Sequence, residues 1–360
     1  MKEDVILGFD VGGTNSRAVV ARSGKDGLDP HPDFPPIVRE KVASKAQLRA
    51  FIQNILASPV LTDAPIARAV IALAGPVIRG SAVTMSNWSG EKEIALHEFE
   101  DWGLPDGGRT ILLNDMEAGC YGLAEHLNKP GPNRISVERL TDAPGVGGGN
   151  RIFIAPGTGL GAAAIIAAKS PSGVSPVPIA AELQHAPMPI LSAEEALVAR
   201  WLRREKDILH PSWDDMVSGR GLVHAYWALY AKTPAGLPGV TPNRGEDFAA
   251  TIARQGVAKD NVVAEHALGF FYTCLGRFCQ LMALGFQPFG GIFIGGASTT
   301  HNRDFIKNGL FIKAFLNNQA QQSLLGKFPI YLVGKGDLNP DGALWLGHFS
   351  NRALPTHEFS

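Results

Sequence analysis

The chain has 360 residues, with 33 lysines and arginines against 34 aspartates and glutamates, which gives a formal net charge of −1. This balance removes the electrostatic case for a nucleic-acid or membrane-surface partner. A content of 45% hydrophobic residues excludes wholesale disorder. The length exceeds what one hydrophobic core usually organises, so we expect two domains.

The first part of the chain alternates short apolar runs with helical patterns, which is typical of α/β architecture. Residues 5–9 are predicted to form a buried strand that enters a glycine turn, and residues 17–20 form the returning strand. A capping box of Ser44 and Gln47 begins a helix that ends before Pro59.

Two further strands, 69–73 and 111–113, precede a helix predicted over residues 116–127. Residues 152–154, a second glycine turn and residues 162–167 then repeat the strand–turn–strand pattern of the N-terminus. Because each half opens on a glycine turn, we interpret the chain as two related halves.

The second half is richer in helical patterns. Ser192 and Glu195 form a capping box, and residues 261–286 are apolar almost all round, as in a helix buried between layers. Strands at 292–294 and 329–333 and a terminal helix at 343–349 follow.

Neither disulfide chemistry nor a membrane segment is predicted. The three cysteines, Cys120, Cys274 and Cys279, include no C-x-x-C pair and are interpreted as buried structural thiols. The apolar run at the N-terminus is too short for a signal peptide, and glycines break the longest apolar region, residues 152–168. We therefore expect a cytoplasmic protein with no membrane or nucleic-acid partner.

The first candidate site is the turn after the first strand, which contains Asp10, Gly12, Gly13, Thr14 and Asn15. Paired glycines let backbone amides approach a phosphate closely, and the Thr14 hydroxyl adds a further donor. Asp10, at the strand end, is a candidate for holding Mg²⁺ through water. Taken alone, the pattern favours an ordinary hairpin turn over a phosphate site, because short glycine motifs match often.

The second glycine turn, with Gly157, Thr158 and Gly159, also follows an apolar strand. It matches G-x-G-x-x-A, and Glu182 follows at a spacing that suits a dinucleotide site, so a dehydrogenase is an alternative. The segment after the glycines, around Ile165, is short for a crossover helix and right for a hairpin strand. We therefore favour a second phosphate-binding turn.

Two polar pairs are candidates for the chemistry itself. Asn114 and Asp115 end the strand at 111–113, where ligands bind in open α/β sheets, and a carboxylate there can accept the proton of an attacking hydroxyl. The alternative is that Asp115 caps the next helix. Glu182 and His185, three residues apart, suit adjacent sugar hydroxyls, although a structural histidine is the alternative.

The last candidate is the strand at 292–294, which opens into Gly295 and Gly296, either a flat floor for a nucleobase or a tight turn only. Taken together and in order, these segments resemble the bacterial-type glucokinase family of the actin-like, sugar-kinase superfamily. The matching segments are Asp10–Asn15, Ala74–Pro76, Leu113–Asp115, Ala155–Gly161, Ser218–Leu222 and Gly290–Gly296.

The resemblance implies an α/β, two-domain actin-like ATPase (ribonuclease H-like) fold, with duplicated mixed sheets and an ATP cleft between the domains. We expect a small domain of residues 1–113 plus 341–360, with the first phosphate hairpin, and a large domain of residues 114–340, with the sugar and adenosine sites. Glucose and ATP are the implied substrates and Mg²⁺ the implied cofactor. No structural zinc is expected, because the cysteine-rich motif of related kinases is absent. The oligomeric state is open, with a homodimer as one option.

Residue roles are implied by position. Asp115 would be the general base for phosphorylation of the glucose 6-hydroxyl. The sugar ligands would be Asn114, Glu182, His185 and Asp214, with Asn87 as a further contact. The ATP-binding residues would be Asp10, Gly12, Gly13, Thr14, Asn15, Gly157, Thr158, Gly159, Gly295 and Gly296, with Asp10 also holding the metal through water.

The chain departs from the family pattern at two places. Leu183 and Gln184 stand where the family often has glycines, and Asp214 stands where glutamate is usual, with Asp215 as the neighbouring register. A kinase for another hexose or an amino sugar is the nearest alternative. A catalytically silent sugar-binding regulator is an alternative of another class, disfavoured because no helix-turn-helix segment precedes the phosphate strand.

Overall fold

The computed structural model describes residues 4–12, 15–24, 27–62, 64–86, 88, 90–128, 135–170, 173–234 and 237–349. The chain forms two compact units: unit 1 spans Met1–Arg134 and Asp337–Ser360, and unit 2 spans Ile135–Gly336. The first break thus falls after α3 (Asp115–Asn128), whereas the sequence placed it before that helix. The physical reason is that α3 packs against α13 (Leu338–Phe349), so both helices belong to unit 1.

Unit 1 is built on a mixed sheet whose main order is β3-β2-β1-β5-β9, with β4 pairing on β2. Its strands are β1 (Asp4–Val11), β2 (Ser16–Ser23), β3 (Leu28–Pro30), β4 (Val38–Glu40), β5 (Ile66–Leu73) and β9 (Thr110–Asn114). β1 and β2 form an antiparallel hairpin, and β1, β5 and β9 run parallel. The carboxyl ends of the parallel strands are adjacent, because Val11 pairs with Leu73 and Leu73 pairs with Asn114.

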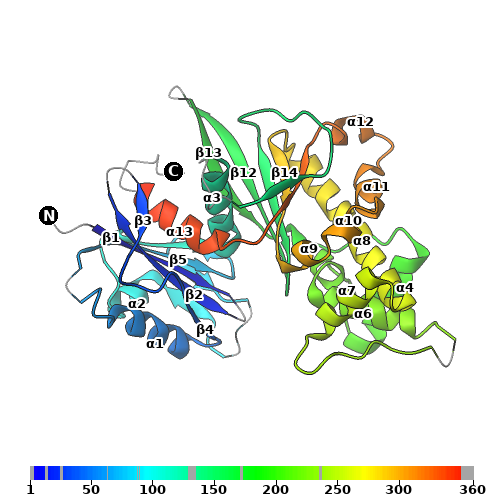
Figure 1. The fold of residues 1–360 in the computed structure, drawn as a ribbon, viewed down its shortest axis with the longest axis horizontal. Coiled ribbons are helices and arrows are strands. Elements are labelled where there is room, and N and C mark those ends of the chain that lie inside the picture. Colours follow the sequence, from blue (N-terminus) through cyan, green and yellow to red (C-terminus); the bar gives the residue numbers. More distant parts are fainter. Residues whose placement is uncertain are drawn as a thin grey trace. The chain divides into compact units, whose positions relative to one another are not determined.

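Helices cover both faces of this sheet. Side chains alternate along β1, so Leu7 and Phe9 pack on one face against α1 (Lys45–Leu56), where Phe51 is fully buried. On the other face Val70 and Ala72 of β5 pack with residues of α3 and α13. Figure 1 shows α1 and α13 on opposite sides of the sheet. The remaining elements of unit 1 are α2 (Leu96–Asp101) and a small sheet of β6 (Val77–Ile78), β7 (Ala82–Thr84) and β8 (Glu93–Ala95).

Unit 2 repeats this topology. Its sheet has the order β10-β15-β14-β11-β12-β13, in which β11 and β12 form the antiparallel hairpin and β11, β14 and β15 run parallel. Its strands are β10 (Val137–Arg139), β11 (Arg151–Pro156), β12 (Leu160–Ser170), β13 (Gly173–Ala181), β14 (Gly291–Ile294) and β15 (Ile330–Val333). The order β13-β12-β11-β14-β15 matches β3-β2-β1-β5-β9 strand for strand, which confirms the predicted repetition.

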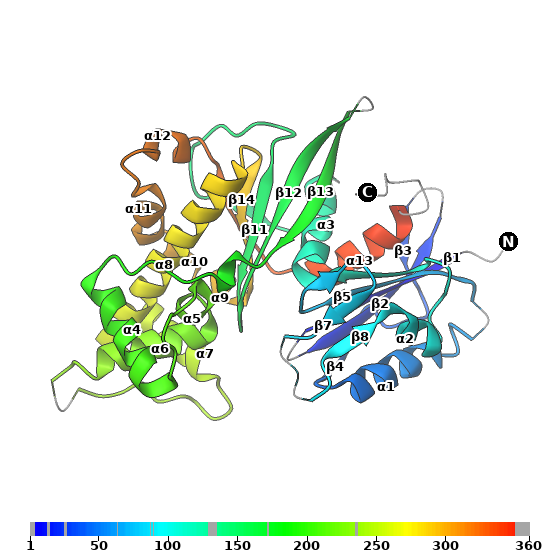
Figure 2. The same ribbon diagram turned by 180° about the vertical axis from the view of Figure 1, so that it is seen from behind.

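Helices make up the rest of unit 2: α4 (Ala193–Lys206), α5 (Trp213–Met216), α6 (Gly219–Tyr230), α7 (Phe248–Ala258), α8 (Val262–Phe286), α9 (Ala297–His301), α10 (Arg303–Ile306), α11 (Leu310–Leu316), α12 (Gln322–Leu325) and the 3₁₀ turn η1 (Leu183–His185). Within the described part of the chain, α8 alone is long and apolar enough to cross a membrane, but 72% of its most apolar window is buried. It packs against α6, α7 and α11 (Figure 2) and is the core helix predicted from its all-round apolar sequence.

Candidate active site

The carboxyl edge of the first sheet gathers the polar residues predicted from the sequence. Asp10, near the end of β1, is only 4% exposed. Its Oδ2 accepts a hydrogen bond from Arg17 Nε at 2.7 Å, and its Oδ1 accepts one from Asn339 Nδ2 at 3.0 Å. Arg17 also contacts Asp337 at 2.7 Å. Burial opposes the charged form of Arg17, but the two carboxylates outweigh it and raise the pKa of Arg17.

The first glycine turn is described only at its two ends. Gly12 and Asn15 flank it, where Val11 pairs with Ser16 across the β1–β2 hairpin. The predicted phosphate ligands Gly13 and Thr14 lie outside the described residues, as does the predicted sugar contact Asn87.

The fit of Mg²⁺ can be tested against the acidic residues. Among the residues that the structure describes, no group of three or more histidine, cysteine, aspartate or glutamate side chains is placed to hold a metal ion. Both oxygens of Asp10 already accept hydrogen bonds. Direct ligation by Asp10 would therefore displace a partner, whereas a contact through water is compatible with this arrangement and with a metal bound mainly to substrate phosphates.

Asn114 caps α3, and Asp115 is the first residue of that helix. Asn114 Oδ1 accepts the N–H groups of Met116 at 2.9 Å and Glu117 at 3.4 Å. The N-cap position therefore belongs to Asn114 rather than to Asp115. Asp115 Oδ1 accepts from Met116 N–H at 2.9 Å, which places a half-buried carboxylate at a helix N-terminus, where negative charge is stabilised.

Gly75, between β5 and the small sheet, fixes the position of Asn114. Asn114 Nδ2 donates to the carbonyl of Gly75 at 3.1 Å. A Cβ at Gly75 would lie 2.1 Å from the carbonyl oxygen of Thr84, so only glycine fits there. The matching segment Ala74–Pro76 thus supports the strand end that carries Asn114 and Asp115.

The second glycine turn joins two antiparallel strands. Pro156 pairs with Leu160 across the β11–β12 hairpin, and Gly157 N–H donates to Gly159 O at 2.8 Å. Thr158 and Gly159 at its tip are exposed. A dinucleotide site requires a strand–turn–helix unit, so this topology excludes the dehydrogenase alternative.

Gly295 and Gly296 lie beside the second turn. Gly295 N–H donates to Ile154 O at 2.9 Å, and Ser298 Oγ donates to Pro156 O at 2.7 Å. Gly296 has φ = 91°, and a Cβ there would lie 2.6 Å from Pro156 O. Glycine at position 296 therefore lets the end of β14 approach the end of β11 closely.

Glu182 and His185 lie together at the end of β13. His185 Nε2 is 3.3 Å from Glu182 Oε2, and both side chains are about half exposed. Gln184, which sequence reasoning treated only as a departure, is 6% exposed and donates from Nε2 to Glu182 Oε2 at 2.8 Å. The 3₁₀ turn Leu183–His185 thus places two polar side chains, Gln184 and His185, beside the Glu182 carboxylate.

Asp214 is brought to the second turn rather than to this group. Its Oδ1 accepts from Leu160 N–H and its Oδ2 from Arg220 Nη2, each at 2.6 Å. The neighbouring Asp215 instead completes a capping box with Ser212. Sequence reasoning missed Arg220 and Arg17, although the antiparallel pairing of Asp10 with Arg17 would have placed that pair together once the length of the turn was known.

A cavity of about 970 Å³ opens beside the second turn within unit 2. Gly157, Thr158, Arg220 and Ser298 line it together with aromatic side chains, including Trp227, which stacks on Phe248 with centroids 5.5 Å apart. A cavity of this size with an apolar wall and glycine amides suits a purine base and its phosphates.

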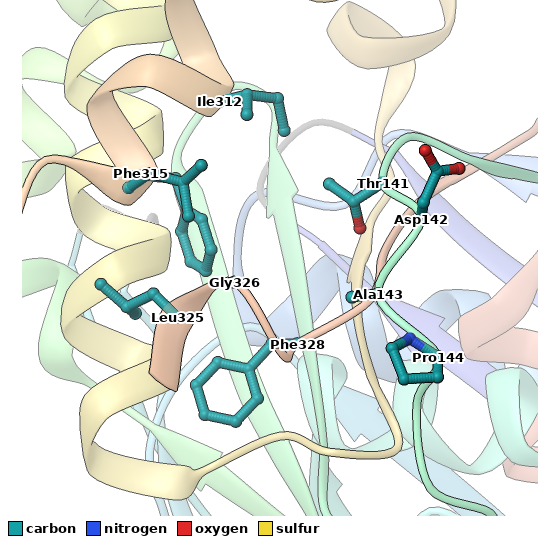
Figure 3. A pocket seen from close by; sticks show the side chains of 10 residues that line it. Thr141, Asp142, Ala143, Pro144, Ile312, Phe315, Leu325, Gly326 and Phe328 are labelled. Carbon is teal, nitrogen blue, oxygen red and sulfur yellow. The ribbon is translucent and has the colours of Figure 1, made fainter. Parts of the chain in front are cut away.

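A second cavity, of about 400 Å³, shares no lining residue with the first. Figure 3 shows Ile312, Phe315 and Leu325 facing the segment Thr141–Pro144 across it. Apart from Asp142, its lining has no charged side chain, so it offers nothing that would bind phosphates.

The two mixed sheets of matching topology, each with a glycine turn after its first strand, define the actin-like ATPase fold of sugar kinases. The chain belongs to the glucokinase family, whose model matches residues 7–347. The glucokinases of Chelativorans sp. (strain BNC1) and Mesorhizobium japonicum are each 28% identical to it, over 344 and 336 residues. These alignments cover 92% and 91% of this chain and 89% and 87% of those proteins.

Solved structures support the same fold. Glucokinase from Balamuthia mandrillaris, in complex with glucose, has a TM-score of 0.78 at 21% identity and covers 96% of this chain and 94% of its own. A ROK family glucokinase from Streptomyces griseus, in complex with glucose and AMPPNP, has a TM-score of 0.61 at 19% identity, with coverage of 95% and 98%. A ROK family transcriptional regulator has a TM-score of 0.64 at 15% identity, with coverage of 95% and 77%, so the fold alone does not distinguish kinase from regulator.

Proposed function

We propose that this protein transfers the γ-phosphoryl group of ATP to the 6-hydroxyl of glucose. The observation that carries the proposal is the position of Asp115. It is the first residue of α3, directly after β9, at the strand-end edge that also carries the Asp10–Asn15 turn. A proton acceptor beside a phosphate turn, in a chain of the glucokinase family, fits phosphoryl transfer to a hydroxyl.

The reaction assigns one proton and one bond change to named groups. The Asp115 carboxylate takes the proton of the 6-hydroxyl as that oxygen bonds to the γ-phosphorus and the bond to the ADP oxygen breaks. Asn114 keeps one amide hydrogen beyond the one given to Gly75, which it can donate to the sugar. Mg²⁺ bound with the nucleotide neutralises phosphate charge, and Asp10 would contact it through water.

The other roles are divided over the two units. In unit 1, Gly12, Gly13, Thr14 and Asn15 would bind phosphate, and Asn87 would contact the sugar. In unit 2, Gly157, Thr158 and Gly159 would bind phosphate, Gly295 and Gly296 would lie by the adenosine, and Glu182 and His185 would bind sugar hydroxyls, with Asp214 as the remaining candidate from the family pattern. The hydrogen bonds that Glu182 can accept from sugar hydroxyls would be charge-assisted, and such bonds are stronger than those between neutral groups.

A coupled assay with ATP and a panel of hexoses and amino sugars tests the proposal. We expect turnover with glucose that requires a divalent cation and is lost in Asp115→Asn. Turnover with another hexose but not glucose would reassign the substrate. Glucose binding without turnover would instead support a sugar-binding regulator. The proposal places the reaction in the cytoplasm, where ATP is available, and requires no nucleic-acid or membrane partner.

A further inference from the structure

Asp214 is buried in unit 2 with both carboxylate oxygens engaged. Only 7% of its side chain is exposed. Oδ1 accepts from the backbone N–H of Leu160 at 2.6 Å, and Oδ2 accepts from Arg220 Nη2 at 2.6 Å. Leu160 is the residue that follows the Gly157–Gly159 turn, so Asp214 is hydrogen-bonded directly to the C-terminal end of that turn.

The segment that carries Asp214 is also hydrogen-bonded to the N-terminal end of the turn. Gly219 N–H donates to Gly157 O at 2.8 Å. Ser218 Oγ donates to Asp214 O at 2.6 Å and accepts from Gly221 N–H at 3.1 Å, which joins α5 to α6. The two hydrogen bonds to the turn therefore come from one segment, residues 214–219, which is stabilised by the hydrogen bonds of Ser218.

Close packing leaves the turn little freedom at this point. A Cβ built on Gly159 would lie 3.2 Å from Asp214 Oδ1, so the glycine lets the backbone approach the carboxylate. Arg220 compensates the buried negative charge, and 63% of its side chain is exposed at the wall of the large cavity. A carboxylate beside a phosphate site would repel the phosphates without such a partner.

We propose that Asp214 is a positioning residue for the second phosphate-binding turn, and that it acts on ATP through Leu160 rather than as a direct ligand of the sugar. This inference rests on the proposed function, because it takes the turn to bind phosphate. It departs from the role that the family pattern implies for position 214, since the oxygens of the shorter aspartate are already committed to Leu160 and Arg220.

Asp214→Asn and Asp214→Glu give opposite results under the two roles. Asn would set an amide against Arg220, and Glu would push its extra methylene against Gly159, so both should disturb the turn. We expect each to raise the KM for ATP and the dissociation constant of AMPPNP about tenfold, with the dissociation constant of glucose, measured by calorimetry without nucleotide, within about twofold of wild type.

A direct sugar ligand predicts the reverse. Asp214→Asn would weaken glucose binding about tenfold with AMPPNP binding unchanged, and Asp214→Glu would preserve or improve the use of glucose; either result overturns the proposal. Asp215→Asn is the matched control, because Asp215 accepts from Ser212 N–H at 2.8 Å and does not contact the turn. It should leave both affinities unchanged.

Two further measurements keep the test decisive. If the Asp214 variants do not fold, Arg220→Gln removes the compensating charge from an exposed side chain and should raise the KM for ATP severalfold without changing the affinity for glucose. An unchanged KM for ATP in that variant would overturn the proposal. Wild-type protein that fails to phosphorylate glucose would contradict the proposed function. If wild-type protein is active but the variants have an unchanged KM for ATP, this inference alone is contradicted.

Discussion

The side-chain amide of Asn114 donates to the backbone carbonyl of Gly75 at 3.1 Å, which ties the N-terminus of α3 to the turn after β5. Asn114 is 6% exposed and also caps α3, so one side chain joins a strand end, a turn and a helix. The position of Asp115, the next residue, therefore depends on the backbone at Gly75.

Gly75→Ala should lower both stability and activity. Its Cβ would meet the Thr84 carbonyl at 2.1 Å, a backbone contact that no side-chain rotation relieves. We expect a loss of about 1–3 kcal/mol in the free energy of unfolding, measured by urea titration, and a lower kcat. Gly24→Ala is the control, because the nearest atom to its Cβ would be 3.9 Å away. Equal stability of the two variants would contradict the close approach at Gly75.

Asp115→Asn should lower kcat about 10²–10⁴-fold while the affinity for AMPPNP stays near wild type. Asn keeps the shape of the side chain and can still accept from Met116 N–H, but it cannot take up the proton of the sugar hydroxyl. Steady-state kinetics and calorimetry separate the two effects. Asp101→Asn, at an exposed position of α2, is the control. A variant that retained half the wild-type kcat would leave Asp115 with a structural role only.

Gln184→Ala should raise the KM for glucose about tenfold with a smaller effect on kcat, because Glu182 loses the amide that holds its Oε2. Gln184→Glu should be worse, since a second carboxylate would repel the first. Leu183→Ala, at a neighbouring side chain that is 37% exposed, is the matched control. A KM for glucose that does not change in Gln184→Ala would mean that Glu182 needs no support from this loop.

Glu117 should make the protein less stable as the pH rises. Burial raises its pKa in the folded state above the ordinary value of 4.5. The unfolded chain therefore loses this proton first, and stability falls between pH 4.5 and the raised folded-state pKa. Glu117→Gln removes this dependence, so its stability relative to wild type, measured by urea unfolding, should increase with pH across that window. A constant difference would contradict ionisation of Glu117.

The cysteines should not react with a thiol reagent in the folded protein. Cys120, Cys274 and Cys279 are all buried, and burial raises the pKa of each thiol. Because the thiolate is the reactive form, a disulfide reagent should label none of them in buffer and all of them in denaturant. Rapid labelling of the native protein would show that a cysteine-bearing helix opens.

The strand–turn–strand units were predictable, because an apolar run that ends in glycines is typical of a strand followed by a tight turn. Asn114, Asp115 and Gly157 lie at the predicted strand ends. The partners of Asp214 were not predictable, because Leu160 lies 54 residues away along the chain and only the tertiary fold brings the two residues together. The supporting contact of Gln184 was equally hidden, since no short-range pattern shows that its side chain turns inward.

The sequence also did not show to which domain α3 belongs. α3 follows β9 directly, and nothing in its own residues shows that α13, more than 200 residues later, covers the same face of the sheet. Gly149 and Gly290 show the same difficulty on a smaller scale. Glycine is required at these positions because the two backbones approach each other closely. A Cβ on Gly290 would lie 2.4 Å from Gly149 O.

The return of the chain to unit 1 has a consequence for synthesis on the ribosome. Unit 2 is contiguous, from Ile135 to Gly336, and can complete its core while translation continues. The first sheet has one apolar face, with Val70 and Ala72, that α3 covers only in part until α13 has emerged. The core of unit 1, which needs α13, is therefore completed after the chain of unit 2 has been made.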